Sequence, residues 1–70
     1  MTLVAMTLKA ARVNKGLTQK QAAILIGCAE DTLGNWERGV SFPDVPQLKR
    51  LEKVYGVPYS ELIFLISDSD

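Results

Sequence analysis

The 70-residue sequence predicts an all-α domain of five short helices. Apolar residues recur three or four positions apart, as they do along one face of a helix. Single glycines and N-capping residues divide the chain into segments of helical length. No segment alternates apolar and polar residues for long enough to indicate a strand. We therefore expect one helical domain over residues 7–66, preceded by a flexible extension at residues 1–6 and followed by a polar tail at residues 67–70.

The first two helices are predicted from glycine stops and a capping box. Gly16 should end the first helix. Residues 18–21, with the sequence Thr-Gln-Lys-Gln, fit a capping box that opens the second helix, and Gly27 should stop it in a left-handed conformation. The residues that share a face of the first helix are Leu8, Ala11 and Lys15. The apolar face of the second helix is predicted to be Ala22, Leu25, Ile26 and Ala29.

The second and third predicted helices form a helix-turn-helix, the best-known short motif that reads DNA. The third helix should span about residues 29–38, with Leu33 and Trp36 on its buried face. Ala23 is small where the two helices must cross closely, and Gly27 lies in the turn. Each of these residues is weak evidence by itself, because small residues and turn glycines are common. Their combination at these offsets indicates the motif strongly.

Two further helices complete the expected domain. Residues 44–47 fit a second capping box, which opens a fourth helix that Gly56 should end. Pro58 and Ser60 are predicted to start a last helix that continues to residue 66. The apolar positions of these two helices are Val45, Leu48, Leu51 and Tyr55, followed by Leu62, Leu65 and Ile66.

Composition restricts both chemistry and location. The single cysteine, Cys28, excludes an intramolecular disulfide, and the absence of histidine removes the usual zinc ligand sets and His-based catalysis. We therefore expect no metal, no cofactor and no enzymatic activity. The longest apolar stretch, residues 22–29, is far shorter than the ~20 residues that a membrane span requires. Without a basic segment that would indicate a signal peptide, the expected location is cytoplasmic.

The net charge is zero, which argues against a general polyanion binder, yet the charges are unevenly distributed. Residues 1–29 contain four bases and no acid, whereas residues 30–70 contain four bases and all eight acids. A basic N-terminal half is typical of a surface that meets a phosphate backbone. Placement of charges for solubility explains the same distribution equally well.

The residues that fit a known family are Thr18-Gln19-Lys20-Gln21-Ala22-Ala23, Gly27, Leu33, Trp36-Glu37-Arg38-Gly39 and Pro43-Asp44. With these residues the chain resembles the Xre family of helix-turn-helix proteins, whose relatives include phage repressors and Cro. The resemblance covers residues 7 to 66. It implies a compact five-helix, repressor-like DNA-binding domain with a central helix-turn-helix at about residues 18–38. It also implies that helix 29–38 enters the major groove, and that a homodimer binds a two-fold symmetric operator.

The resemblance also implies roles for individual residues. Those expected to read base edges from the outward face of helix 29–38 are Glu30, Asp31, Gly34 and Asn35. Those expected to contact DNA phosphates are Gln19, Lys20, Arg38 and Ser41. Asn35 can pair with adenine, and Glu30 or Asp31 can accept from cytosine. Each role has an alternative: Gln19 is also a good first-turn residue, and the two acids also stabilise a helix start that Ala29 leaves without a side-chain cap.

Two further expectations concern structure and assembly. In the family that the chain resembles, the residues that match Arg12 and Glu37 form a partly buried ion pair between the first and third helices. Arg12 is therefore expected to be structural rather than a DNA ligand. Ile63 and Phe64 add apolar surface to the last predicted helix, and homodimerisation through that helix is the expected use.

The sequence thus leads to two functional hypotheses. The first is a sequence-specific regulator of transcription that binds double-stranded DNA as a repressor, and Gln19, Asn35 and Arg38 favour it. The second is a protein-interaction module on the same fold, such as an antitoxin-like or anti-repressor partner. Zero net charge and the lack of bases in residues 40–42 favour this alternative.

Overall fold

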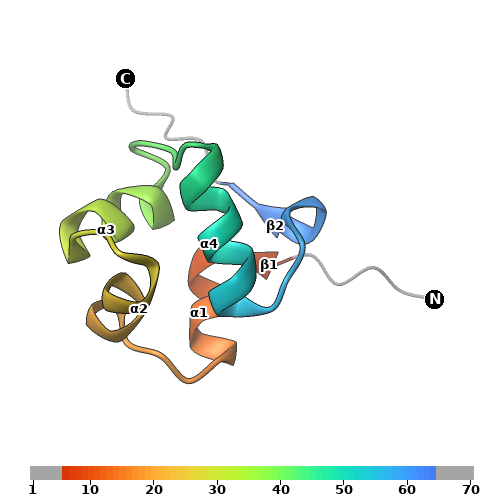
Figure 1. Ribbon diagram of the computed structural model, residues 1–70, viewed down its shortest axis with the longest axis horizontal. Helices are drawn as coiled ribbons and strands as arrows, with labels where there is room; N and C mark the ends of the chain where they lie inside the picture. Colours follow the sequence, from red (N-terminus) through yellow and green to blue (C-terminus); the bar gives the residue numbers. More distant parts are fainter. Residues whose placement is uncertain (1–5, 65–70) are drawn as a thin grey trace.

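The computed structural model describes residues 6–64, in which short helices pack around one core (Figure 1). The α-helices within this range are α1 (Leu8–Asn14), α2 (Gln19–Ile26), α3 (Glu30–Arg38) and α4 (Val45–Tyr55). The remaining elements are β1 (Met6–Thr7), a 3-10 turn η1 (Tyr59–Glu61) and β2 (Leu62–Ile63). No helix in this part of the chain is long and apolar enough to cross a membrane.

In the described residues, a 3-10 turn and a short strand take the place of the predicted fifth helix. After one 3-10 turn, Leu62 adopts an extended conformation, and β2 pairs in parallel with β1, with Met6 opposite Leu62. This pairing satisfies backbone groups between the two ends of the described chain and buries Leu62. The strands are too short to show an alternating pattern, which is why the sequence did not indicate them. Leu65 and Ile66 lie outside the described residues.

The predicted starts of α2 and α4 are confirmed. Thr18 Oγ1 accepts from the Gln21 backbone N–H at 3.1 Å, and the Gln21 side chain accepts from the Thr18 N–H at 2.9 Å. Asp44 and Gln47 make the same reciprocal pair at the start of α4. Two of the four donors that each helix start exposes are thereby satisfied locally, so both helix starts are fixed by local sequence.

The core lies where the four helices meet, and its most buried residues include Leu8, Ala11, Ala22, Ala23, Ile26, Leu33, Trp36, Leu51 and Tyr55. Leu25 and Val45 were expected to face it, but they are 59% and 64% exposed. The reason for Leu25 is geometric. Successive helical residues are rotated by about 100°, so a face centred on Ala22, Ala23 and Ile26 places Leu25 beyond its edge.

Tyr55 carries a buried hydroxyl into this core. Its side chain is 2% exposed, and among the described residues its Oη has no hydrogen-bond partner. Burial raises the pKa of Tyr55 far above its ordinary value of 10, and the negative charge of Glu37 raises it further. The folded protein therefore retains the neutral hydroxyl, and a buried hydroxyl without a hydrogen-bond partner costs about 1–3 kcal/mol.

Tyr55→Phe should therefore leave the free energy of unfolding unchanged or raise it by up to about 3 kcal/mol at neutral pH. The difference should widen above the ordinary tyrosine pKa of 10. There the phenol ionises only in the unfolded chain, so the wild type loses up to about 1.4 kcal/mol of stability per pH unit, a contribution that the variant lacks. Urea unfolding of both proteins at neutral and alkaline pH measures this. Parallel pH profiles would contradict it.

Candidate nucleic-acid interface

A glycine turn joins α2 to α3 and fixes how α3 lies on the core. Gly27 has a φ of 88°, in the left-handed region that glycine adopts without strain. The N–H groups of Gly27 and Cys28 both donate to the Ala23 carbonyl oxygen, at 2.8 and 3.0 Å. Leu33 and Trp36 anchor α3 with 0% and 2% exposure, which confirms their predicted burial. The opposite side of α3 is consequently turned away from the core.

The first turn of α3 is exposed and acidic. Glu30 and Asp31 both reach solvent, and Ala29 at the N-cap position makes no side-chain hydrogen bond. The two carboxylates lie where the positive end of the helix dipole stabilises them. Their position is compatible both with contact to bases and with a purely structural role.

Arg12 and Glu37 contact each other between α1 and α3. Arg12 Nε donates to Glu37 Oε2 at 2.7 Å, and Arg12 Nη2 donates to Glu37 Oε1 at 3.3 Å. Arg12 Nη1 also donates to the Leu17 carbonyl oxygen at 2.9 Å. The two side chains are only 10% and 5% exposed. Arg12 is thus committed to internal contacts, which argues against a direct contact with DNA.

The same carboxylate holds Gln19, the first residue of α2. Gln19 Nε2 donates to Glu37 Oε1 at 3.0 Å, so the Gln19 side chain leans towards α3. The sequence pattern did not reveal this contact, because it joins residues of two different helices. A primary amide has two N–H donors and one acceptor oxygen, so part of the Gln19 amide still has the capacity to bond a phosphate.

Gly34 and Asn35 are less accessible than the sequence predicts. Gly34 was expected on the outward face of α3, but it is buried, because the side chains of Gln19 and Arg38 lie over it. Asn35 is half-buried, and its Oδ1 accepts from Arg38 Nη2 at 2.6 Å. A spacing of three residues places Asn35 and Arg38 on one helix face, so the sequence held a signal for their contact.

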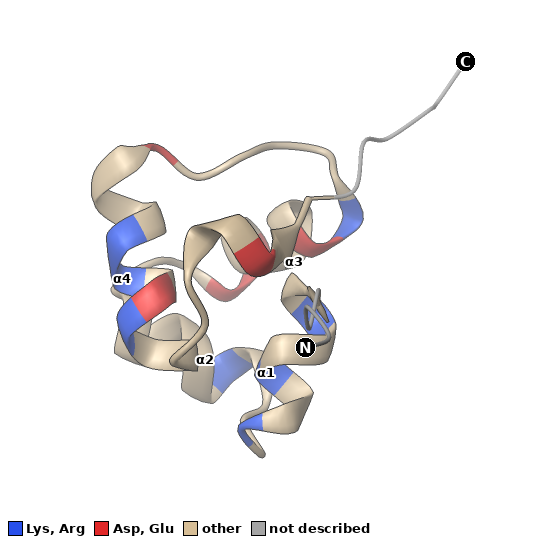
Figure 2. Ribbon diagram, turned by 90° about the vertical axis from the view of Figure 1, so that its right-hand side faces the viewer, with Lys and Arg blue, Asp and Glu red and all other residues tan. Residues whose placement is uncertain are grey.

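The remaining predicted phosphate contacts flank α3. Lys20 is exposed in the first turn of α2, and Arg38 is exposed at the last residue of α3. Ser41 is half-buried just after α3, where its backbone N–H donates to the Asn35 carbonyl oxygen at 3.5 Å. Figure 2 shows basic residues on all four helices, and acidic residues on α3 and α4. Arg38 is the one base of α3, so most of the positive charge near this helix comes from the neighbouring helices.

Comparison with known proteins agrees with this geometry. A family model described as helix-turn-helix matches residues 8–62. The chain is also similar to the cryptic phage CTXphi transcriptional repressor RstR of Vibrio cholerae, with 37% identity over 59 residues. The aligned region covers 84% of this chain and 50% of that repressor, so the chain spans about half the length of this curated relative.

The buried ion pair leads to a prediction about stability. Arg12→Met or Glu37→Gln alone should lower the free energy of unfolding by about 3–5 kcal/mol, because one charge then remains buried without its partner. The double variant should lose clearly less than the sum. Urea unfolding of all four proteins measures the coupling, with sucrose added if a single variant is unfolded in buffer. Strictly additive losses would contradict the role given to the pair.

Proposed function

The chain belongs to the Xre-type helix-turn-helix family of DNA-binding proteins, and from this premise we propose that it is a sequence-specific regulator of transcription that acts as a repressor. The observation that carries the proposal is the orientation of α3. Leu33 and Trp36 fix one side of this helix to the core, while Glu30, Asp31 and Arg38 are exposed. A helix held in this way can be inserted into DNA without disturbing the core.

In the proposed complex α3 enters the major groove of double-stranded DNA, which is wide enough for an α-helix. Glu30 and Asp31 face base edges from its first turn, and Asn35 lies one turn further on. Gln19 and Lys20 meet a phosphate at the start of α2, where backbone N–H groups and the helix dipole favour an anion. Phosphate contacts set the position of the protein, and α3 supplies the discrimination between sequences.

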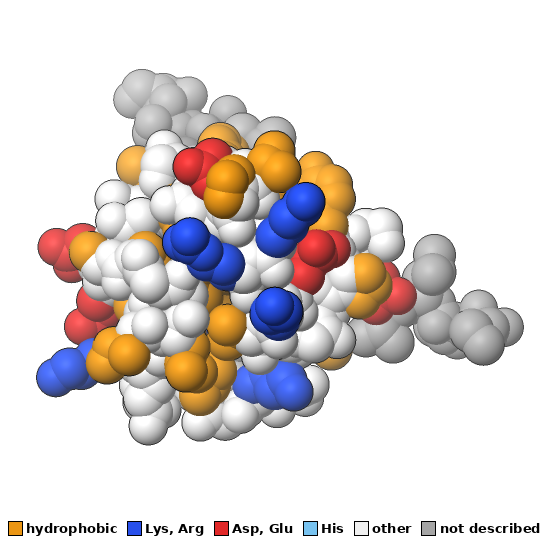
Figure 3. All heavy atoms as spheres, in the orientation of Figure 1, with side chains coloured by type: hydrophobic (Ala, Val, Ile, Leu, Met, Phe, Trp, Pro, Cys, Tyr) orange, Lys and Arg blue, Asp and Glu red, His pale blue; other side chains and the backbone are white. Residues whose placement is uncertain are grey.

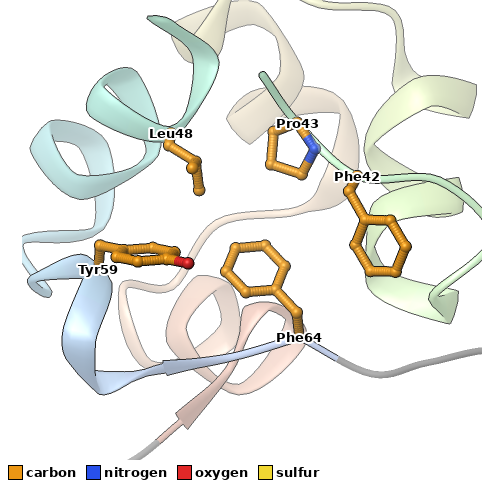
Figure 4. Close-up of a pocket in the computed structure, with 5 residues that line it drawn as sticks. All are labelled: Phe42, Pro43, Leu48, Tyr59 and Phe64. Atoms are coloured by element: carbon orange, nitrogen blue, oxygen red, sulfur yellow. The ribbon is translucent and has the colours of Figure 1, made fainter. Parts of the chain in front are cut away.

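A homodimer on a two-fold symmetric operator is the second part of the proposal. A groove of about 250 Å³ lies beside β2 and is lined by Phe42, Pro43, Leu48, Tyr59 and Phe64. Figure 4 shows Phe64 between Tyr59 and Phe42, and the ring centroids of Tyr59 and Phe64 are 6.0 Å apart. Phe42 and Tyr59, which line the groove, are 54% and 55% exposed, and Ile63, which precedes Phe64 in the chain, is 43% exposed. Contiguous apolar surface of this kind supports self-association, and a dimer doubles the number of bases read.

One observation favours a protein-interaction module instead. Ile24 and Leu25 on α2 are 70% and 59% exposed, and with Leu17 and Gln21 they line a second hollow of about 300 Å³. Figure 3 shows hydrophobic side chains at the surface over α2, at the lower left of that view. Together with zero net charge, this surface fits a partner protein better than it fits a phosphate backbone.

Selection from a pool of random duplexes should recover a preferred DNA sequence. Lys20→Ala should weaken binding to all sequences to a similar degree, because a phosphate contact carries no base information. It should also flatten the dependence of log K on log salt by about 0.9 for each phosphate that the variant no longer neutralises. Electrophoretic mobility shifts at several salt concentrations measure both effects. If no duplex binds even at low salt, the interaction module becomes the better explanation.

The proposed dimer interface is tested by placing a charge at Ile63, the exposed residue of β2. Ile63→Asp should weaken self-association, because a carboxylate would be buried at the interface without a partner. Ile24→Asp places the same charge at an even more exposed position on α2 and should leave self-association unchanged. Sedimentation equilibrium measures the oligomer, and circular dichroism verifies that both variants fold. Equal behaviour of the two variants would contradict a dimer interface at β2.

A further inference from the structure

Arg38 is folded back along α3 instead of extending away from it. Its Nη2 donates to Asn35 Oδ1 at 2.6 Å. Its Nη1 lies 3.2 Å from the place that a Cβ at position 34 would occupy. The guanidinium thus covers the residues three and four positions before it, which is the direction in which helical side chains point. A side chain held in this way lies over the middle of α3, the helix that is proposed to enter the groove.

The glycine at position 34 makes this arrangement possible. Gly34 is not among the residues with positive φ, so its backbone conformation does not require glycine. Glycine within a helix is also unfavourable relative to alanine. The close neighbour of a side chain at this position would be Arg38, because a Cβ would lie 3.2 Å from Arg38 Nη1, whereas its distance of 3.6 Å from Gln19 Nε2 is an ordinary contact. The missing side chain therefore lets the Arg38 guanidinium lie close to the helix backbone.

The neighbouring acid does not bind Arg38. Glu37 is engaged by Arg12 and Gln19, and among the described residues no carboxylate forms an ion pair with Arg38. Arg38 Nη2 gives one N–H to Asn35, so a second N–H on Nη2 and both on Nη1 still have the capacity to donate. A planar pair of donors of this kind matches the O6 and N7 acceptors of guanine.

We propose that Arg38 reads a guanine in the major groove, and that Asn35 and Gly34 are positioning residues that hold its guanidinium for this contact. This inference rests on the proposed DNA-binding function and replaces the phosphate contact first expected of Arg38. It also changes the role of Asn35. Its Oδ1 already accepts from Arg38, and a two-bond contact with adenine would need that same oxygen.

Arg38→Lys separates the two roles of Arg38, because lysine keeps the positive charge but lacks the planar pair of donors. On the sequence selected by the wild-type chain, base reading predicts a loss of about 5- to 140-fold in the preference for one G·C base pair. Binding to unrelated duplexes should change little. Lys53→Ala, which removes an exposed charge from α4, serves as a control and should leave every base preference unchanged.

Gly34→Ala tests the positioning role. The added methyl group must displace the guanidinium by a few tenths of an ångström, so the preference for the same base pair should fall. Alanine favours a helix more than glycine, so the melting temperature should not fall with it. A weaker preference at an unchanged or higher melting temperature is therefore the expected result, and it excludes general loss of structure as the cause.

Three outcomes would overturn the inference, and they are distinguishable. If the wild type binds duplexes with a sequence preference that Arg38→Lys leaves intact, Arg38 is a phosphate contact, and the proposed function stands without the inference. If Arg38→Lys relaxes the preference but Gly34→Ala does not, the positioning role of Gly34 is wrong. If the wild type binds no duplex, both the proposed function and the inference that rests on it are wrong.

Discussion

The position of α3 depends on one buried carboxylate, that of Glu37. A carboxylate that is 5% exposed is costly unless it is paired, and Arg12 pairs with it through two N–H groups. The third contact of Arg12, with the Leu17 carbonyl oxygen, ties the loop before α2 to the same centre. Because Glu37 also accepts from Gln19, the start of α2 and the end of α3 share one charged group. Any change that moves Glu37 therefore moves the side chains proposed to meet DNA.

Small residues decide how close the two helices of the motif come to each other. Ala22 and Ala23 are 0% and 2% exposed on the inner side of α2, and Gly27 supplies the turn. Gly34 serves the outer side of α3 in a different way, since its missing Cβ leaves room for side chains rather than for a backbone. Small residues thus allow both the close packing of α2 in the core and the close approach of the Arg38 side chain to the outer side of α3. Larger residues at Ala22 or Ala23 would overpack the core, whereas a larger residue at Gly34 would displace the side chains that lie over it.

The parts of the fold that the sequence predicted correctly depend on residues that are close together in the sequence. The capping boxes at Thr18 and Asp44 and the turn at Gly27 depend on residues within four positions of each other. The exposure of Leu25 was missed because periodicity locates an apolar stripe but does not say which residue lies at its centre. The replacement of the last helix by η1 and β2 was missed because Leu62 pairs with Met6, at the other end of the described chain. For the site, sequence reasoning named the exposed Glu30, Asp31 and Arg38. It missed the burial of Gly34 and the contacts made by Arg38 and Gln19, which depend on how side chains of two helices fold over each other.

The pairing of β1 with β2 has a consequence for the order in which the molecule assembles. The contacts of α2 with α3 close short loops and cost little chain entropy, so they form early. The pairing of β1 with β2 closes a loop of almost the entire described chain and gains only two short strands, so we expect it to form last. Phe64, which directly follows β2, lines the apolar groove only when this closure holds. The proposed association of two copies through this groove would thereby depend on the pairing of β1 with β2, whereas the helix-turn-helix itself does not contain either strand.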